Sequence, residues 1–151
     1  MATITLQGNP INTNGDLPAV GSQAPDFTLT NGDLGEVSLA QFEGKKKVLN
    51  IFPSIDTGIC ALSTKAFNEA AAQHDDTVFL TISSDLPFAL GRFCGAEGLE
   101  NVQPLSMMKD RQFASDYGVS IQDGPLASLS ARAVVVLNAQ NEVMYTELVP
   151  E

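Results

Sequence analysis

The sequence has 151 residues, of which 44% are hydrophobic and 17% charged, and this composition predicts a single globular domain over residues 1–151. Eighteen acidic residues against eight basic ones give a formal net charge of -10, which argues against binding to nucleic acid or to an anionic membrane surface. The N-terminal segment MATITLQGNP lacks the basic and apolar regions of a signal peptide, and apolar runs such as 133–137 are too short to span a bilayer. We therefore expect a cytoplasmic protein.

The first 47 residues predict short strands and turns. Residues 3–14, TITLQGNPINTN, alternate apolar and polar around a Gly-Asn-Pro turn, which is typical of a β-hairpin. Residues 24–47 contain short apolar pieces interrupted by Asn-Gly and Gly, which predicts irregular strands. The lysine run 45–47 follows Gly44, and we interpret it as a solvated turn before a strand, with a docking patch as the less favoured alternative.

Residues 47–84 predict a strand-helix-strand unit. KVLNIFP (47–53) and TVFLTISS (77–84) are patterns of buried strands, and CALSTKAFNEAAAQ (60–73) is the pattern of a helix between them. One face of this helix carries four apolar residues: Leu62, Ala66, Phe67 and Ala70. A parallel pair of strands follows from this order.

The second half of the chain continues the alternation. LPFALGRFC (86–94) predicts a short helix with Pro87 in its first turn, and DRQFASDYG (110–118) predicts a helix closed by Gly118. NVQPLSMM (101–108) between them is expected to be an irregular extended segment.

The final segment, ARAVVVLNAQNEVMYTELV (131–149), predicts an antiparallel hairpin around residues 138–141. Alternating strands and helices followed by this hairpin favour an α/β fold, with a central mixed β-sheet flanked by helices and an N-terminal β-hairpin. Thioredoxin-like is the small fold that best matches this order.

Cys60 has an unusual position for a cysteine, because it follows a polar turn at the expected start of a helix. If Thr57 is the N-cap, Cys60 is the third helical residue and lies near backbone N–H groups that have no intrahelical acceptor. These donors and the helix dipole stabilise a thiolate and lower a cysteine pKa from about 8.5 toward neutrality or below. The position therefore indicates a nucleophile.

The other candidate residues exclude several classes of site. Two cysteines are too few for a disulfide scaffold, so any pair is expected to be transient. His74 is the only histidine, which leaves little to build a Ser-His-Asp or Cys-His arrangement or a metal site, and we expect it at the surface near a helix end. No metal and no cofactor are predicted. Arg92 and Arg111 are expected to be surface residues.

The segment PSIDTGIC, from Pro53 to Cys60, matches the P-x-x-x-T-x-x-C signature of peroxiredoxins. Its surroundings KVLNIFPSIDTGIC, SSDLPFALGRFCGAEGL and DGPLASLSARAVVVLN resemble the bacterial thiol peroxidases, an atypical two-cysteine branch of that family, over nearly the whole chain. The resemblance implies a thioredoxin-like (peroxiredoxin) fold and reduction of hydrogen peroxide and organic hydroperoxides. It also implies that Cys60 is the peroxidatic cysteine, and that Cys94 of the same subunit is the resolving cysteine, which forms a Cys60–Cys94 disulfide with the oxidised Cys60. Thioredoxin as the electron donor and a homodimer are further implications of the resemblance.

The resemblance assigns three further residues to the peroxide pocket. Thr57 would hold the peroxide and the thiolate with its hydroxyl, Pro53 would shield the thiolate from water, and Arg132 would bring a positive charge to the pocket. Each has a simpler interpretation: Thr57 as a helix cap, Pro53 as a strand terminator and Arg132 as a strand end at the surface. Arg132 is the most informative, because an arginine directly before the apolar run 133–137 is costly to bury without an anionic partner.

Two other functions remain as alternatives. A thioredoxin-like disulfide oxidoreductase requires a C-x-x-C motif, but Cys60 is followed by Ala-Leu-Ser. A redox-inert binding module on the same fold would keep Pro53 and Thr57 only by accident. Members of the family usually continue beyond the segment TELVPE into a final helix, so we expect that C-terminal helix to be absent here.

The helix around Cys94 is expected to be weak, because it contains Gly91, Gly95 and Gly98. Two cysteines on separately packed helices seldom lie close enough for a disulfide. We therefore predict that oxidation melts residues 91–98 together with the first turn that contains Cys60.

Overall fold

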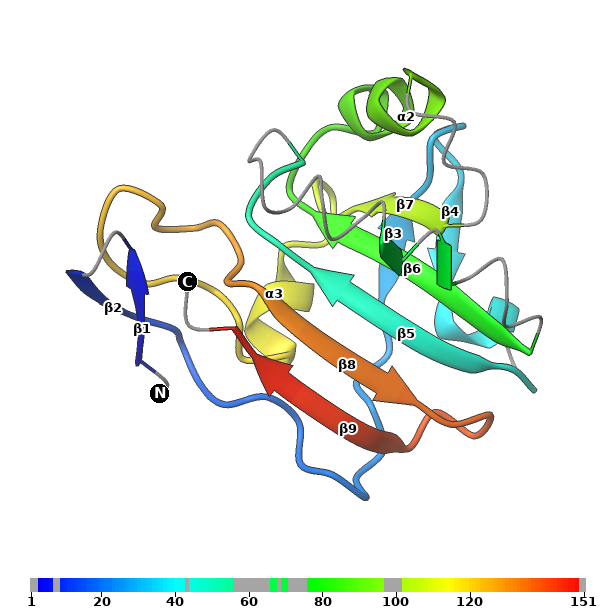
Figure 1. Ribbon diagram of the computed structural model, residues 1–151, viewed down its shortest axis with the longest axis horizontal. Coiled ribbons are helices and arrows are strands. Elements are labelled where there is room, and N and C mark those ends of the chain that lie inside the picture. The colour runs from blue at the N-terminus through cyan, green and yellow to red at the C-terminus, as the bar shows by residue number, and fades with distance from the viewer. Residues whose placement is uncertain are drawn as a thin grey trace.

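The computed structural model of the chain describes residues 3–6, 9–42, 44–55, 66–67, 69–70, 76–96 and 102–149. These residues form two sheets (Figure 1). The smaller is the predicted N-terminal hairpin, in which β1 (Thr3–Leu6) pairs antiparallel with β2 (Asn9–Asn12). No helix in this described part of the chain is long and apolar enough to cross a membrane.

The larger sheet has seven strands and carries the core. In spatial order they are β4 (Glu36–Ser38), β3 (Thr28–Thr30), β7 (Val102–Ser106), β6 (Thr77–Ser83), β5 (Lys46–Ile51), β8 (Ala133–Leu137) and β9 (Val143–Leu148). The strands β5, β6 and β7 are parallel, whereas β8 pairs antiparallel with β5 and with β9. This mixed sheet confirms the predicted α/β fold, the parallel pair at its centre and the closing hairpin.

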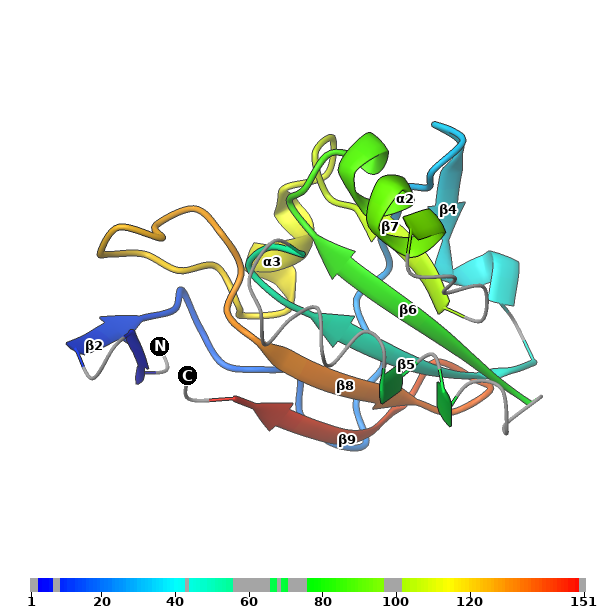
Figure 2. The ribbon, with the colours of Figure 1, turned by 45° about the horizontal axis from the view of Figure 1, so that its top comes forward.

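The helices cover opposite faces of the sheet (Figures 1 and 2). Side chains alternate between the two faces of a strand, and in β6 Leu80 packs in the large core cluster with Phe113 of α3 (Gln112–Asp116). The neighbouring Phe79 packs instead with Cys94 of α2 (Pro87–Ala96). A short 3-10 helix, η1 (Leu39–Phe42), follows β4.

Both predicted short helices are present. Pro87 occupies the first residue of α2, where a missing N–H costs no intrahelical hydrogen bond. The helix α3 is followed by Gly118, whose φ of +70° lies in the left-handed region. A Cβ there would lie 2.0 Å from the carbonyl oxygen of Asp16, so glycine is required.

The segment 101–108 was predicted to be extended and irregular; its centre is extended, but it is the regular strand β7. Val102 to Ser106 pair in parallel register with Phe79 to Ser83 of β6. Pro104 is tolerated because β3, on the other side of β7, pairs only through Thr30 and Ser106. A proline can occupy a strand where its missing N–H is not needed by a neighbour.

The interpretation of residues 45–47 as a solvated turn is wrong for its last lysine. Lys47 lies inside β5, opposite Val78 and Leu137, and its side chain is fully buried. Its Nζ donates a hydrogen bond to Oδ1 of Asn141 at 2.6 Å, which offsets part of the cost of burying an ammonium group. Lys46 remains exposed, with its Nζ 3.8 Å from a carboxylate oxygen of Asp76.

Most of the helix predicted over residues 60–73 lies outside the described residues. Within it, residues 66–67 and 69–70 are helical. Phe67 and Ala70 pack against the cluster around Phe79, as predicted, but Ala66 is exposed, so its placement on the apolar face is wrong. Leu62 lies outside the described residues.

Candidate active site

The chain leaves the central strand β5 through Phe52 and Pro53. The backbone N–H of Phe52 donates to the carbonyl oxygen of Ile82 at 3.1 Å, which continues the contact with β6. The buried hydroxyl of Ser130 donates to the carbonyl oxygen of Phe52 at 2.8 Å. Pro53 follows at once and is half-buried. Both backbone polar groups of Phe52, the residue before Pro53, are therefore held by hydrogen bonds to neighbouring segments.

Arg132 lies directly before β8, the antiparallel neighbour of β5. Because Ile51 pairs with Ala133, Arg132 is next to Phe52 and one residue from Pro53 along the same end of the sheet. Ala133 belongs to the large core cluster on the α3 face, so alternation directs the half-buried Arg132 toward the opposite face. This is the face on which α2 packs. The fold brings Arg132 and Pro53 into the same region.

A carboxylate holds the turn after Pro53 in place. Oδ1 of Asp85 accepts a hydrogen bond from the hydroxyl of Ser54 at 2.8 Å, and its Oδ2 accepts from the backbone N–H of Ile55 at 2.7 Å. Oδ2 also accepts from the hydroxyl of Ser83 at 2.6 Å. Neither Asp85 nor Ser54 was among the residues expected at the site, because their contacts join segments about 30 positions apart in the sequence.

Cys94 is buried in α2, with 9% of its surface exposed. Its side chain packs with Phe79 and Val102, and Phe67 contacts the same cluster. Burial raises the pKa of the Cys94 thiol, because desolvation disfavours the charged thiolate. Cys94 in this position is therefore a protonated and covered thiol.

The structure does not bring Cys94 to the end of the sheet where Pro53 and Arg132 lie. Val48 of β5 packs against the Cys94 cluster, whereas Phe52 is four residues farther along the strand, which is about 13 Å at the usual rise of a strand. Cys60 lies outside the described residues, so the expected opening of the Cys94 helix on oxidation stays a prediction.

The remaining predicted residues divide into two groups. Cys60, Thr57 and His74 lie outside the described residues. Arg92 and Arg111 are exposed, as predicted, and Arg111 donates from Nη2 to the carbonyl oxygen of Ser128 at 3.2 Å. Among the residues that the structure describes, no group of three or more His, Cys, Asp or Glu could hold a metal ion.

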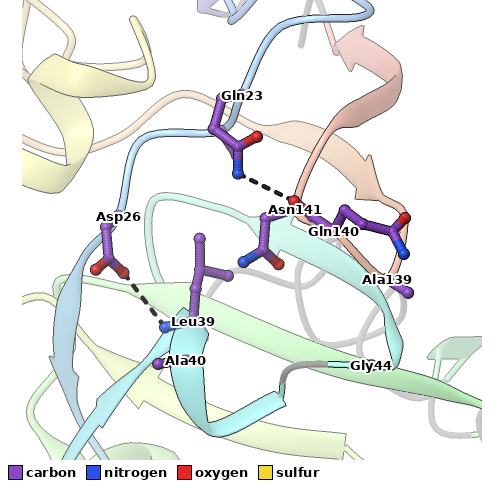
Figure 3. A pocket seen from close by; sticks show the side chains of 9 residues that line it. Gln23, Asp26, Leu39, Ala40, Gly44, Ala139, Gln140 and Asn141 are labelled. Carbon is purple, nitrogen blue, oxygen red and sulfur yellow. Dashed lines mark hydrogen bonds between the residues drawn. The ribbon is translucent and has the colours of Figure 1, made fainter.

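A cavity of about 610 Å³ lies at the other end of the sheet (Figure 3). Gly44, just before β5, and residues 139–141, between β8 and β9, contribute to its wall. Its polar side chains are already partly engaged: Gln23 donates from Nε2 to the carbonyl oxygen of Gln140 at 3.0 Å, and Oδ1 of Asp26 accepts from the N–H of Leu39 at 3.4 Å. This cavity is separate from the region of Pro53 and Arg132.

Comparison with known proteins shows extensive similarity. A family model described as Redoxin matches residues 19–151. The thiol peroxidase of Mycobacterium tuberculosis is 62% identical over 151 residues, which are 100% of this chain and 90% of that relative. A solved peroxiredoxin-like protein from Aquifex aeolicus has a TM-score of 0.94 at 36% identity, covering 100% of this chain and 88% of that chain. The thiol peroxidase from Chromobacterium violaceum has a TM-score of 0.90 at 25% identity, covering 98% of this chain and 86% of that chain.

Proposed function

Because the chain belongs to the Redoxin family and, within it, to the bacterial thiol peroxidases, we propose that it reduces hydroperoxides through the thiolate of Cys60. The chain is a thiol-dependent peroxidase, and the observation that carries this conclusion is the 62% identity over all 151 residues to a thiol peroxidase. The proposal adds which residues act and in what order.

In the first step the Cys60 thiolate attacks one oxygen of the hydroperoxide. The O–O bond breaks, the sulfur keeps the attacked oxygen with its hydrogen as a sulfenic acid, and the other oxygen takes a proton from solvent and leaves as an alcohol or water. Negative charge grows on the departing oxygen, so hydrogen-bond donors that face it accelerate the step. We assign this task to the Thr57 hydroxyl and the Arg132 guanidinium, with Pro53 keeping water away from the sulfur.

In the second step Cys94 attacks the sulfenic sulfur of Cys60. An S–S bond forms and the sulfenic oxygen leaves as water, so the peroxide has taken two electrons from the two thiols. We propose that the dithiol of thioredoxin then reduces the Cys60–Cys94 disulfide. The packing of Phe67 against the Cys94 cluster supports this pairing, because Phe67 lies seven positions after Cys60 on the segment predicted to be one helix.

Peroxide consumption with and without thioredoxin and thioredoxin reductase tests the proposed cycle. We expect sustained consumption of hydrogen peroxide and of an organic hydroperoxide only with the complete reducing system. Reduction of a protein disulfide without peroxide turnover would instead indicate a disulfide oxidoreductase, and no turnover at all would indicate a redox-inert module.

We also propose a homodimer in the cytoplasm, on the basis of the family; light scattering on the purified protein tests the dimer.

The position of Arg132 predicts that both the charge and the planar donor groups of its guanidinium contribute to peroxide reduction. Replacing Arg132 by methionine is expected to lower kcat/KM for peroxide by about 100-fold or more, as expected when a donor to developing charge is lost. Arg132→Lys retains the charge but loses the planar fork of donors, so it should recover only part of the rate. The Cys60 thiol pKa, measured from alkylation rate against pH, should rise in Arg132→Met. If this variant has an unchanged thiol pKa and an unchanged peroxidase rate, Arg132 has only a structural role.

The buried position of Cys94 predicts that the two thiols differ in reactivity. In the reduced protein at pH 7, iodoacetamide is expected to modify Cys60 much faster than Cys94, since Cys94 is covered and its pKa is raised. Mass spectrometry of the peptides after increasing exposure times measures both rates. In denaturant the two rates should become similar. Equal rates in the folded protein would contradict the sequestered state of Cys94.

A further inference from the structure

We propose that Asp85 is a positioning residue that connects the segment leading to Cys60 with the start of the helix that carries Cys94. Through this connection it sets the rate of Cys60 oxidation relative to the rate of Cys60–Cys94 disulfide formation. This inference rests on the proposed function. It concerns a residue that lies between the two cysteine segments.

On one side Asp85 is anchored to the end of the sheet. Its Oδ2 accepts from the hydroxyl of Ser83, and its own carbonyl oxygen accepts from the hydroxyl of Ser106 at 2.6 Å. Both serines are fully buried at the ends of adjacent strands. The N–H of Met107 donates to the carbonyl oxygen of Ser83 at 2.9 Å, which ties the same two strand ends together. Asp85 is therefore held in place by the buried ends of β6 and β7.

On the other side Asp85 holds the turn after Pro53. Its two oxygens accept from the hydroxyl of Ser54 and from the N–H of Ile55. Ile55 is five positions before Cys60, and its side chain is 2% exposed. It packs with Phe52 and with Leu90 of α2, so a polar tie and an apolar contact act on the same residue.

Asp85 also lies immediately before the first turn of α2. The carbonyl oxygen of Leu86 accepts the N–H groups of Ala89 and Leu90 at 3.0 and 3.2 Å, so α2 begins two residues after Asp85, with only Leu86 between them. A shift of Asp85 would move the start of this helix. The Asp85 side chain thus fixes the entry to the Cys60 segment relative to the entry to the Cys94 helix.

An ionised carboxylate suits this position because all three side-chain contacts come from donors. An amide has only one acceptor oxygen and turns its NH2 group toward one of the donors, and alanine leaves the N–H of Ile55 without its partner. Loss of the tie should free the turn after Pro53. The conformation in which the turn is held and Cys60 reacts with peroxide would then be less populated. The open conformation in which Cys60 and Cys94 can form a disulfide would be more populated.

Rapid-mixing kinetics on Asp85→Ala tests this inference. We expect the second-order rate of Cys60 oxidation to fall at least about tenfold, because the variant removes both hydrogen bonds that hold the turn, and one hydrogen bond to a charged group already accounts for about tenfold or more. The rate of disulfide formation should stay the same or rise. Because further oxidation of the sulfenic acid to sulfinic acid competes with disulfide formation, the sulfinic fraction at high peroxide should fall. General loss of stability would not slow Cys60 oxidation while leaving disulfide formation equally fast or faster.

Asp26→Ala is the matched control, because Asp26 also accepts backbone N–H groups, those of Phe27 and Leu39, but lies at the other end of the sheet. It should leave both rates unchanged. Asp85→Asn should fall between the wild type and Asp85→Ala. If Asp85→Ala does not fold, Ser54→Ala is the second variant, because it removes the hydrogen bond from the Ser54 hydroxyl to Oδ1 of Asp85 and leaves Asp85 itself in place. Unchanged ratios of the two rates in these variants would overturn the role of Asp85. An active Cys60→Ser protein would instead overturn the proposed function itself.

Discussion

Replacing Cys60 by serine is expected to reduce peroxide consumption with thioredoxin to the background rate while the protein remains folded. Attack on an O–O bond requires an ionised, polarisable sulfur, and a serine hydroxyl is not ionised at neutral pH. Serine is close to cysteine in size, so the helix start should be preserved. The assay follows NADPH oxidation through thioredoxin reductase, with circular dichroism and thermal unfolding as checks of the fold.

The matched control for this variant is Cys94→Ser. It should still consume one equivalent of peroxide in a single fast phase, because the first step needs only Cys60. It should not turn over with thioredoxin, because no intrasubunit disulfide can form. Comparable turnover by the Cys60→Ser protein, or a missing first phase in Cys94→Ser, would show that the two cysteines have been assigned the wrong roles.

Local sequence patterns were sufficient to predict most of the strands. The strands β5, β6 and β8 have few exposed residues on either face, and such strands appear in the sequence as nearly continuous apolar segments. The strand β7 was predicted only as an irregular extended segment, and Pro104 at its centre lacks the N–H that a regular ladder uses. Its tolerance depends on how few residues of β3 pair with β7, which is a property of the whole sheet.

The same limit applies to single side chains. Lys47 looks solvated in the sequence because it ends a lysine run, but the register of β5 turns it into the sheet and toward Asn141, 94 positions later. Asp85 joins Ser54, Ile55 and Ser106, which are separated by up to 52 positions, and no local pattern marks such a meeting point. The resemblance to a family pointed to Arg132, and the pairing of β8 with β5 explains how it comes near Pro53.

Oxidation is expected to melt α2 around Cys94, and this is the largest structural change that we predict. A disulfide needs Cα atoms roughly 4.4 to 6.8 Å apart, whereas Cys94 packs beside Phe79, away from the end of the sheet that carries Pro53. Amide hydrogen exchange should therefore show residues 91–98 protected in the reduced protein and largely unprotected in the oxidised one, together with the first turn around Cys60. Equal protection of both segments in the two states would contradict the prediction.

The glycines of α2 lower the stability of this helix, and we expect this low stability to speed disulfide formation. Gly91 and Gly95 are exposed in α2, and a Cβ added at either meets no atom within 4 Å, so alanine fits without strain. Because a helical glycine costs about 0.8 to 1.0 kcal/mol relative to alanine, Gly91→Ala should slow disulfide formation by about fivefold, if the helix must open first. Gly32→Ala, in the turn between β3 and β4, also has free space for a Cβ and serves as the control. A stiffer α2 with undiminished disulfide formation would mean that Cys94 reaches Cys60 without unwinding, and the glycines would then need another explanation.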